Sequence, residues 1–206
     1  MKKLQFLFLF LLTFLFLQDA NAQWSVTPSI GVNNAKSTFI SCKPISRINY
    51  FMIGIAPKYK FDKKNAAELG IQFSQKGFGA GIIIPAAKIQ YLDLLPTFEY
   101  NLLRNLSLYS GLNVGFRLSE LYASDNKNWK KNRTVENVYR SVDLGAIIGF
   151  RVKYKNYQLG FHFNQGLMNA STIQYNDANG NVLNQEKEFH QNFQLSLGYQ
   201  INVKHK

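Results

Sequence analysis

The sequence has a single cysteine, Cys42, so no disulfide can form within the chain. Acidic residues are also few, with 12 Asp and Glu against 24 Lys and Arg, and the formal net charge is +12. Glycine-rich phosphate loops and paired metal-ligand motifs are absent. Beyond residue 22, no apolar run approaches the ~20 residues that a membrane-spanning helix needs. These absences exclude a fold held by disulfides, and they leave any crossing of a membrane to strands.

The N-terminus has the three parts of a secretory signal peptide. A short basic segment, "MKK", precedes the apolar run "LQFLFLFLLTFLFL", and the small-residue motif "ANA" ends at Ala22. The alternative, a retained anchor, is disfavoured because the apolar run is short for a spanning helix. No cysteine follows Ala22, so a lipid anchor is not indicated. We expect residues 1–22 to be a cleaved signal peptide and residues 23–206 to form one domain.

The expected mature chain stays strongly basic. Cleavage would remove Lys2, Lys3 and Asp19 and leave 184 residues with 22 basic and 11 acidic side chains, a formal charge of +11. Such a charge can indicate nucleic-acid binding, but export from the cytoplasm argues against that partner. An anionic membrane surface suits the charge better.

Apolar and polar residues alternate strictly near the C-terminus. From Phe193 to Val203 every second residue is apolar, which predicts a strand with one apolar and one polar face. Comparable alternation, stronger or weaker, predicts seven more strands, over residues 24–32, 50–61, 67–76, 89–100, 106–118, 142–154 and 157–167. Pro57 and Pro96 weaken two of these predictions, because proline cannot donate to a strand ladder.

The predicted connections alternate between short and long. Residues 62–65, 101–105 and 155–156 form short turns, whereas residues 33–49, 77–88, 119–137 and 169–188 form long loops. All short turns would therefore lie at one end of the sheet. Transmembrane barrels of the bacterial outer membrane have short periplasmic turns and longer external loops.

The composition of the polar face indicates which face meets water. It is mostly Gly, Ser, Asn and Gln, which the crowded interior of an eight-stranded barrel can hold. Aromatic residues recur near the short-turn end, at Tyr59, Phe61, Tyr100, Tyr154 and Tyr157, where an aromatic girdle would lie. We therefore expect an all-β fold, an eight-stranded antiparallel transmembrane β-barrel with short periplasmic turns and long extracellular loops. An exported soluble barrel of the lipocalin type is the alternative.

Several segments resemble a known family. "YLDLLPTFEYNL", "VDLGAIIGFRVKY", "YQLGFHFNQGLMN" and "FQLSLGYQINVK" make the mature chain similar to the outer-membrane β-barrel proteins of Bacteroidetes often called PorT-like. The tail "VKHK" departs from the aromatic C-terminal residue of many such barrels. The resemblance implies insertion into the cell outer membrane by the outer-membrane assembly machinery. One branch of the family is linked to type IX secretion, and nothing in this sequence singles out that branch.

Charged residues are predicted on the inner face. Isolated buried charges are costly, so they should pair and fill the lumen; the candidates are Lys58, Lys60, Glu68, Asp93, Glu99, Arg117, Asp143, Arg151 and Lys153. The short turn after Phe61 should bring Lys58 and Lys60 alongside Glu68 on the next strand. We expect ion pairs of this kind to close the barrel, so that it is not a general porin.

The long loops contain a basic segment with a tryptophan at its centre. It comprises Lys127, Trp129, Lys130, Lys131 and Arg133, and Lys36, Lys43 and Arg47 of the first loop add to the same rim. The segment is either a solvated loop or a contact for lipopolysaccharide phosphates at the outer surface.

Other motifs do not support a catalytic, cofactor or metal site. "NDANGN" lacks the closing Glu of a calcium loop, and Asn179-Gly180 predicts the tip of a hairpin. His162 has no serine two residues on and is predicted to point into the lumen. No motif supports a combination of His190 with Ser171 or Asp177 of the outer loop. We expect a non-enzymatic barrel that is structural or assists envelope biogenesis or secretion. The alternative is a barrel enzyme that acts on lipids.

Overall fold

The computed structural model describes residues 23–39, 46–79, 86–123, 128–131, 138–172, 174–176, 182–185 and 187–203. The expected signal peptide, Cys42, Lys43, Lys127, Arg133 and the Asn179-Gly180 tip lie outside these ranges. No helix among the described residues is long and apolar enough to span a membrane.

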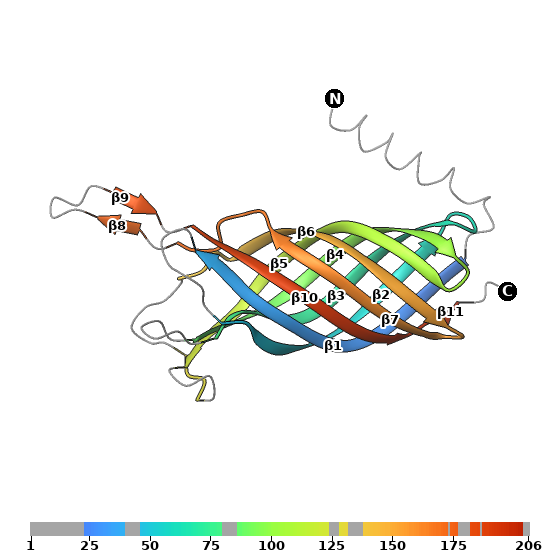
Figure 1. Cartoon of the computed structure of the whole chain (residues 1–206), viewed down its shortest axis with the longest axis horizontal. Helices are drawn as coiled ribbons and strands as arrows, with labels where there is room; N and C mark the ends of the chain where they lie inside the picture. Colours follow the sequence, from blue (N-terminus) through green and yellow to red (C-terminus); the bar gives the residue numbers. More distant parts are fainter. Residues whose placement is uncertain are drawn as a thin grey trace, which may run out of the picture.

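Eight long antiparallel strands form a closed barrel (Figure 1). They are β1 (Gln23–Phe39), β2 (Ile48–Lys60), β3 (Asn65–Phe78), β4 (Ala86–Leu103), β5 (Leu106–Ala123), β6 (Val142–Tyr154), β7 (Tyr157–Gly166) and β10 (Glu188–Tyr199). Each strand pairs with the next, and β1 closes the barrel on β10 in a register that runs from Ser29 opposite Gly198 to Phe39 opposite Glu188. The short β11 (Ile201–Asn202) continues this edge against β1. The predicted eight-stranded barrel is confirmed.

The two ends of the barrel differ as predicted. Residues 61–64, 104–105 and 155–156 make the short turns, at the end where β1 begins and β11 lies (Figure 1). Lys155 has a φ of 53°, a left-handed conformation that lets two residues reverse the chain between β6 and β7. At the other end, β8 (Gln174–Asn176) and β9 (Val182–Gln185) pair as a small hairpin beyond the barrel (Figure 1). This hairpin forms a separate two-stranded sheet and does not continue the ladder between β7 and β10.

Several strands run further than the alternation predicts. β1 continues to Phe39, β3 to Phe78 and β5 to Ala123, and β4 already begins at Ala86, so parts of three expected loops are strand. In these extensions the strands stay paired although apolar and polar residues no longer alternate. Lys36 on β1, for example, pairs with Gln191 on β10. Backbone hydrogen bonds need no apolar side chains, and only the part of a strand that faces lipid must be apolar on its outer face.

The apolar face of each strand is the outer face of the barrel. On the outer face of β10, Leu195 and Leu197 are each 51% exposed, whereas Gln194 on the inner face of the same strand is 5% exposed. Ile148 on β6, at 67%, is another of many large apolar side chains on this outer surface. A soluble barrel would bury these side chains, so the exposure supports the membrane barrel over the lipocalin-like alternative.

Pro57 and Pro96 lie inside strands at gaps in the ladder. The β2–β3 register has no pairs between Ile55 opposite Ile71 and Lys58 opposite Glu68. The β4–β5 register has a similar gap between Leu94 and Thr97. Each proline still pairs on its other side, Pro57 with Val26 and Pro96 with Leu69, so each interrupts one ladder only.

Candidate functional site in the barrel lumen

A cluster of five charged side chains crosses the lumen towards the short-turn end. Lys58 Nζ lies 3.1 Å from Glu68 Oε2 and 2.7 Å from Glu99 Oε2. Arg151 holds Glu68 at two points, with Nη1–Oε2 at 3.1 Å and Nη2–Oε1 at 2.8 Å. Arg151 and Lys153 also pair with Glu99. These residues come from β2, β3, β4 and β6, so the cluster spans the inside of the barrel; we call it the lower cluster.

Strand register explains why these residues meet. Lys58 and Glu68 are direct cross-strand partners, and so are Ala66 and Glu99. Curvature of the closed sheet then brings Arg151 on β6 opposite Glu68, across β4 and β5. The cluster has three cations and two carboxylates, and its acidic members are almost fully buried.

A second cluster lies further towards the outer end. Lys76 Nζ is 3.0 Å from Asp93 Oδ1, 3.0 Å from Asp143 Oδ2 and 3.1 Å from Asn113 Oδ1. Ser74 donates to Asp93 Oδ2 at 2.6 Å. This upper cluster joins β3, β4, β5 and β6, and it has two carboxylates for one ammonium group.

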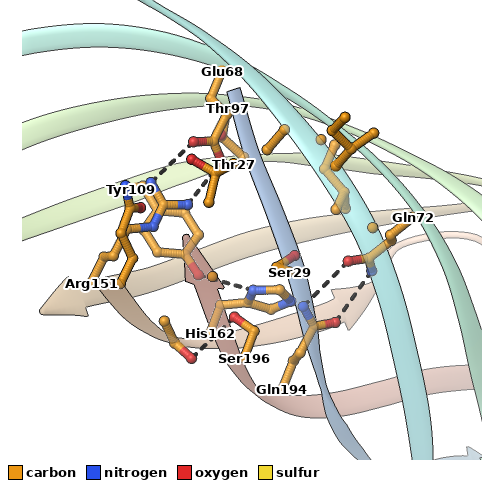
Figure 2. A pocket seen from close by; sticks show the side chains of 18 of the residues that line it. Thr27, Ser29, Glu68, Gln72, Thr97, Tyr109, Arg151, His162, Gln194 and Ser196 are labelled. Carbon is orange, nitrogen blue, oxygen red and sulfur yellow. Dashed lines mark hydrogen bonds and ion pairs between the residues drawn. The ribbon is translucent and has the colours of Figure 1, made fainter. Parts of the chain in front are cut away.

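A polar cavity of about 60 Å³ lies beside the lower cluster (Figure 2). Arg151 and Glu68 border it on one side, and Gln72 and Gln194 point toward each other on another, with Nε2 of Gln72 3.2 Å from Oε1 of Gln194. Gln72 also contacts Asp93 of the upper cluster at 3.4 Å. The volume and the polar lining suit a few water molecules.

Small residues create this cavity. Gly54, Gly160 and Gly198 line it from β2, β7 and β10, where a larger side chain would fill the space. A Cβ at Gly54 would lie 2.6 Å from Cβ of Gln72. The small residues that the sequence predicts on the inner face therefore leave room for the side chains of the neighbouring strands and for the cavity.

His162 points into the lumen, as its position in the alternation predicts. Its Nδ1 lies 3.0 Å from the Tyr109 hydroxyl, and Arg151 lies over the Tyr109 ring with 4.7 Å between Cζ and the centroid. His162 is therefore an interior side chain with a hydrogen-bond partner, and Asn164, two residues on, is also buried.

The predicted lumen residues fall into three groups. Seven of them form the two clusters: Lys58, Glu68, Glu99, Arg151 and Lys153 below, and Asp93 and Asp143 above. Arg117 is separate and pairs with Glu120 nearer the outer end of β5. Lys60 is opposite Ala66 and forms no ion pair with any described side chain, so its expected pairing with Glu68 is wrong.

Sequence reasoning missed two members of these networks. Lys76 is the last residue of the predicted strand 67–76 and shares the alternation of Glu68, so it could have been found from that strand. Glu120 could not, because the register shifts between Gln90 and Tyr91 and moves it to the inner face. Without this bulge, Glu120 would share the outer face with Leu118.

The structure also brings together one serine and one histidine that the sequence did not connect. Ser37 and His190 are cross-strand partners on β1 and β10, and Ser37 Oγ lies 3.0 Å from His190 Nδ1. The Tyr91 hydroxyl is 3.4 Å from His190 Nε2. Ser37 is 4% exposed and His190 1% exposed, so the pair is buried in the outer half of the barrel.

The described part of the basic outer segment packs on the barrel. Lys130 pairs with Tyr122 as an isolated bridge, and Lys88 Nζ lies 4.2 Å from the centroid of the Trp129 ring. Lys130 and Lys131 are exposed. Arg47, from the first loop, lies over Phe193 at 4.7 Å. Among the described residues, no group of three or more His, Cys, Asp or Glu is placed to hold a metal ion.

The chain is similar to solved structures of small outer-membrane barrels. Ail, the attachment invasion locus protein of Yersinia pestis, aligns with a TM-score of 0.51 at 14% identity, over 86% of this chain and 98% of that one. OprG from Pseudomonas aeruginosa aligns at 0.43 and 14% identity, over 89% and 97%. Neisserial surface protein A aligns at 0.47 and 9% identity, over 87% and 98%. A comparison with curated proteins finds no match.

A family model provides the assignment that these low identities cannot. The model described as "Outer membrane protein beta-barrel domain" matches residues 16–172, well over half of the chain. This match agrees with the closed barrel, its apolar outer face and its charged interior. The chain belongs to this family and is an integral β-barrel protein of the outer membrane.

Proposed function

We propose that the protein is a non-enzymatic barrel with a closed lumen, which supports envelope structure or biogenesis through its two ends. The observation behind this proposal is the lower cluster, in which Arg151 on β6 reaches Glu68 on β3 through the interior. The cross-lumen contact between Gln72 and Gln194 adds a second obstruction. A lumen filled at these levels leaves the ends of the barrel as the surfaces where partners can bind.

Conductance measurements test the closed lumen. Purified protein in a planar bilayer should show no steady, ion-selective current. A stable open channel would place the function in transport instead. The paired variant Glu68→Gln with Arg151→Met, which removes the two-point ion pair, should show more frequent openings than wild type.

The finer assignment to the PorT-like proteins of Bacteroidetes is part of this proposal. Its support is the resemblance of the strand motifs in residues 91–102, 142–154 and 157–169. A helper of secretion should be recovered with its partner, so cross-linked envelopes should be purified through a tag in an outer loop. Reproducible enrichment of secretion components would support a role in type IX secretion, and enrichment of assembly machinery alone would support a purely structural barrel.

We further propose that Lys127, Trp129, Lys130, Lys131 and Arg133 contact lipopolysaccharide phosphates. The exposure of Lys130 and Lys131 and the packing of Lys88 on Trp129 support an amphipathic surface at the outer rim. The double variant Lys130→Gln, Lys131→Gln should bind lipopolysaccharide more weakly, with a smaller dependence on salt. If the variant binds lipopolysaccharide as well as the wild type does, the segment is a solvated loop and the proposed contact is wrong.

A second candidate function is an enzyme that acts on lipids, because Ser37 and His190 form a hydrogen-bonded pair. A nucleophile must be reached by its substrate, and both side chains are buried, so we favour a structural role. Lipid A profiles of a deletion strain and of a Ser37→Ala strain separate the two functions. We expect both profiles to match wild type; a lipid change shared by both strains would favour the enzyme.

A further inference from the structure

The three short turns place four cations around one end of the barrel. Lys63 and Lys64 lie in the β2–β3 turn, Arg104 in the β4–β5 turn and Lys155 in the β6–β7 turn, and all four are exposed. We call these four residues the basic rim. The short turns contain one acidic residue, Asp62.

Asp62 makes its side-chain hydrogen bonds within its own turn. Its carboxylate accepts hydrogen bonds from the backbone N–H groups of Lys64, at 2.6 Å, and Asn65, at 2.8 Å, and from Nδ2 of Asn65, at 2.8 Å. These bonds fold the carboxylate back into its own turn. No cation of the basic rim forms an ion pair with a described side chain. The four charges are therefore available to an external anion.

Backbone hydrogen bonds fix the turns relative to one another. The amide of Asn101 donates to the carbonyl of Lys64 at 2.7 Å, and that of Lys153 donates to Asn105 at 2.8 Å. The amide of Gln200 donates to Asn156 at 2.7 Å. Each turn is thus bonded to the chain segment beside it, at the end of the barrel where all three turns lie (Figure 1).

An aromatic belt lies next to these turns on the outer surface of the barrel. Its exposed members are Trp24, Tyr100, Tyr154, Tyr157 and Tyr199. Trp24 packs on Tyr59 with 5.0 Å between ring centroids, and Tyr157 packs on Tyr199 at 5.3 Å. Lys155 Nζ is 5.6 Å from the centroid of its neighbour Tyr154. Since Trp and Tyr lie at the membrane–water interface, the basic rim lies at the depth of the lipid phosphates.

We propose that the basic rim binds the phosphate groups of anionic phospholipids in the periplasmic leaflet. Phosphatidylglycerol should be enriched there over zwitterionic phosphatidylcholine. The cations are spread over three turns around the barrel and lie at the level of the aromatic belt. This arrangement fits a surrounding shell of headgroups better than a single acidic protein docked at one side. Such binding would fix the depth of the barrel in the membrane.

Tryptophan quenching can test this proposal leaflet by leaflet. The chain has two tryptophans; Trp24 lies in the aromatic belt and Trp129 beyond the opposite end of the barrel strands. The Trp129→Phe variant leaves Trp24 as the only tryptophan, which can be excited selectively at the long-wavelength edge of its absorption, where tyrosine absorbs little. This variant can be reconstituted into phosphatidylcholine vesicles that contain brominated phosphatidylglycerol or brominated phosphatidylcholine. Quenching of Trp24 should give an association constant about fivefold higher for phosphatidylglycerol, as expected for one basic residue near an anionic headgroup.

Four substitutions should abolish this preference. In the background of Trp129→Phe they are Lys63→Gln, Lys64→Gln, Arg104→Gln and Lys155→Asn, the last because asparagine tolerates the φ of 53° at this position. The ratio of the association constants for phosphatidylglycerol and phosphatidylcholine should then fall to about one. In protein with the unsubstituted rim, high salt should lower the same ratio. The matched control, Lys130→Gln with Lys131→Gln at the other end, should keep the fivefold preference.

Equal quenching by the two lipids in the unsubstituted rim would overturn the proposal. A preference that survives all four substitutions would overturn it as well, because the preference would then arise elsewhere. Heat-modifiable migration in gels verifies that each variant is folded. Binding of an acidic cell-wall fragment to the rim, with equal lipid quenching, would assign the rim to the cell wall and contradict lipid binding.

Discussion

Arg151 on β6 and Glu68 on β3 form a two-point ion pair through the interior of the barrel, although they are 83 residues apart in the sequence. Two strands separate β3 from β6 along the sheet. The pair therefore exists only once the barrel has closed, and it links opposite parts of the wall. Each partner also has a second ion pair, because Lys58 contacts Glu68 and Glu99 contacts Arg151.

Neutralising Glu68 should destabilise the barrel. In Glu68→Gln, three cations of the lower cluster would share the single carboxylate of Glu99. Removal of one partner of a buried ion pair costs about 3–5 kcal/mol, because the remaining charge is buried without compensation. Urea unfolding in lipid vesicles measures this loss. The control is Lys60→Gln, which alters a nearby cation that has no ion pair among the described residues and should change stability by less than about 0.5 kcal/mol.

A charge on the outer face of β10 should also be costly. Leu195 is half exposed and lies four residues from Tyr199 of the aromatic belt, close to the middle of the apolar surface. Leu195→Arg should cost about 2–4 kcal/mol, as for arginine at the bilayer midplane. Ile201→Arg, at the short-turn end, should cost about 0–1 kcal/mol. Equal costs at both positions would contradict the depth assigned to β10.

The alternation of the strands was enough to predict both faces of this barrel. From Phe193 to Tyr199 every second residue of β10 is apolar because lipid surrounds the barrel, and the intervening Gln194, Ser196 and Gly198 must fit inside it. Alternation is a local property, so it could not give the contact between Arg151 and Glu68, which depends on how the whole sheet curves and closes. It also gave no face for Glu120, which fell in the expected loop 119–137 and follows a bulge that shifts the faces of the strand.

The ends of the strands were the least predictable part of the fold. Outside the lipid, both faces of a strand can be polar, as around Lys36 on β1. Such segments look like loops in the sequence, although their backbones remain paired. The Ser37–His190 pair was missed for this reason, because Ser37 fell in an expected loop.

Acid should weaken the first short turn. Hydrogen bonds from the Asn65 side chain, and then from the backbone N–H groups of Lys64 and Asn65, lower the pKa of Asp62 below its ordinary value of 3.8. A lowered pKa in the folded state means that Asp62 stabilises the fold above its unfolded pKa, and that this contribution is lost as the pH falls through the folded pKa. An NMR titration of the Asp62 carboxyl carbon in micelles should show a midpoint below 3.8. In Asn65→Ala the midpoint should rise; an unchanged midpoint would exclude the side-chain hydrogen bond as the main cause.

Export and sidedness can be tested on the residues outside the described ranges. N-terminal sequencing of protein from the outer membrane should begin at Gln23, because "ANA" is a cleavage motif. Cys42, the only thiol, lies in the first long connection and should react with a membrane-impermeant maleimide on intact cells. Recovery of Met1 in the mature protein would refute cleavage. If Cys42 reacts in the purified protein but is labelled in cells only after permeabilisation, the first long connection faces the periplasm and the proposed orientation is wrong.

An accessibility scan along β10 is the most direct test of the central claim, which is that the apolar face of the barrel meets lipid and that its polar interior is closed. Cys42→Ser removes the native thiol, and single cysteines at positions 193–199 then receive a nitroxide label. Relaxation of the label by oxygen, which partitions into lipid, and by a water-soluble nickel complex should be measured in vesicles. Labels at Phe193, Leu195, Leu197 and Tyr199 should respond to oxygen, and labels at Gln194 and Ser196 should respond weakly to both reagents. A reversed alternation, or strong nickel access at the even-numbered positions, would contradict the account.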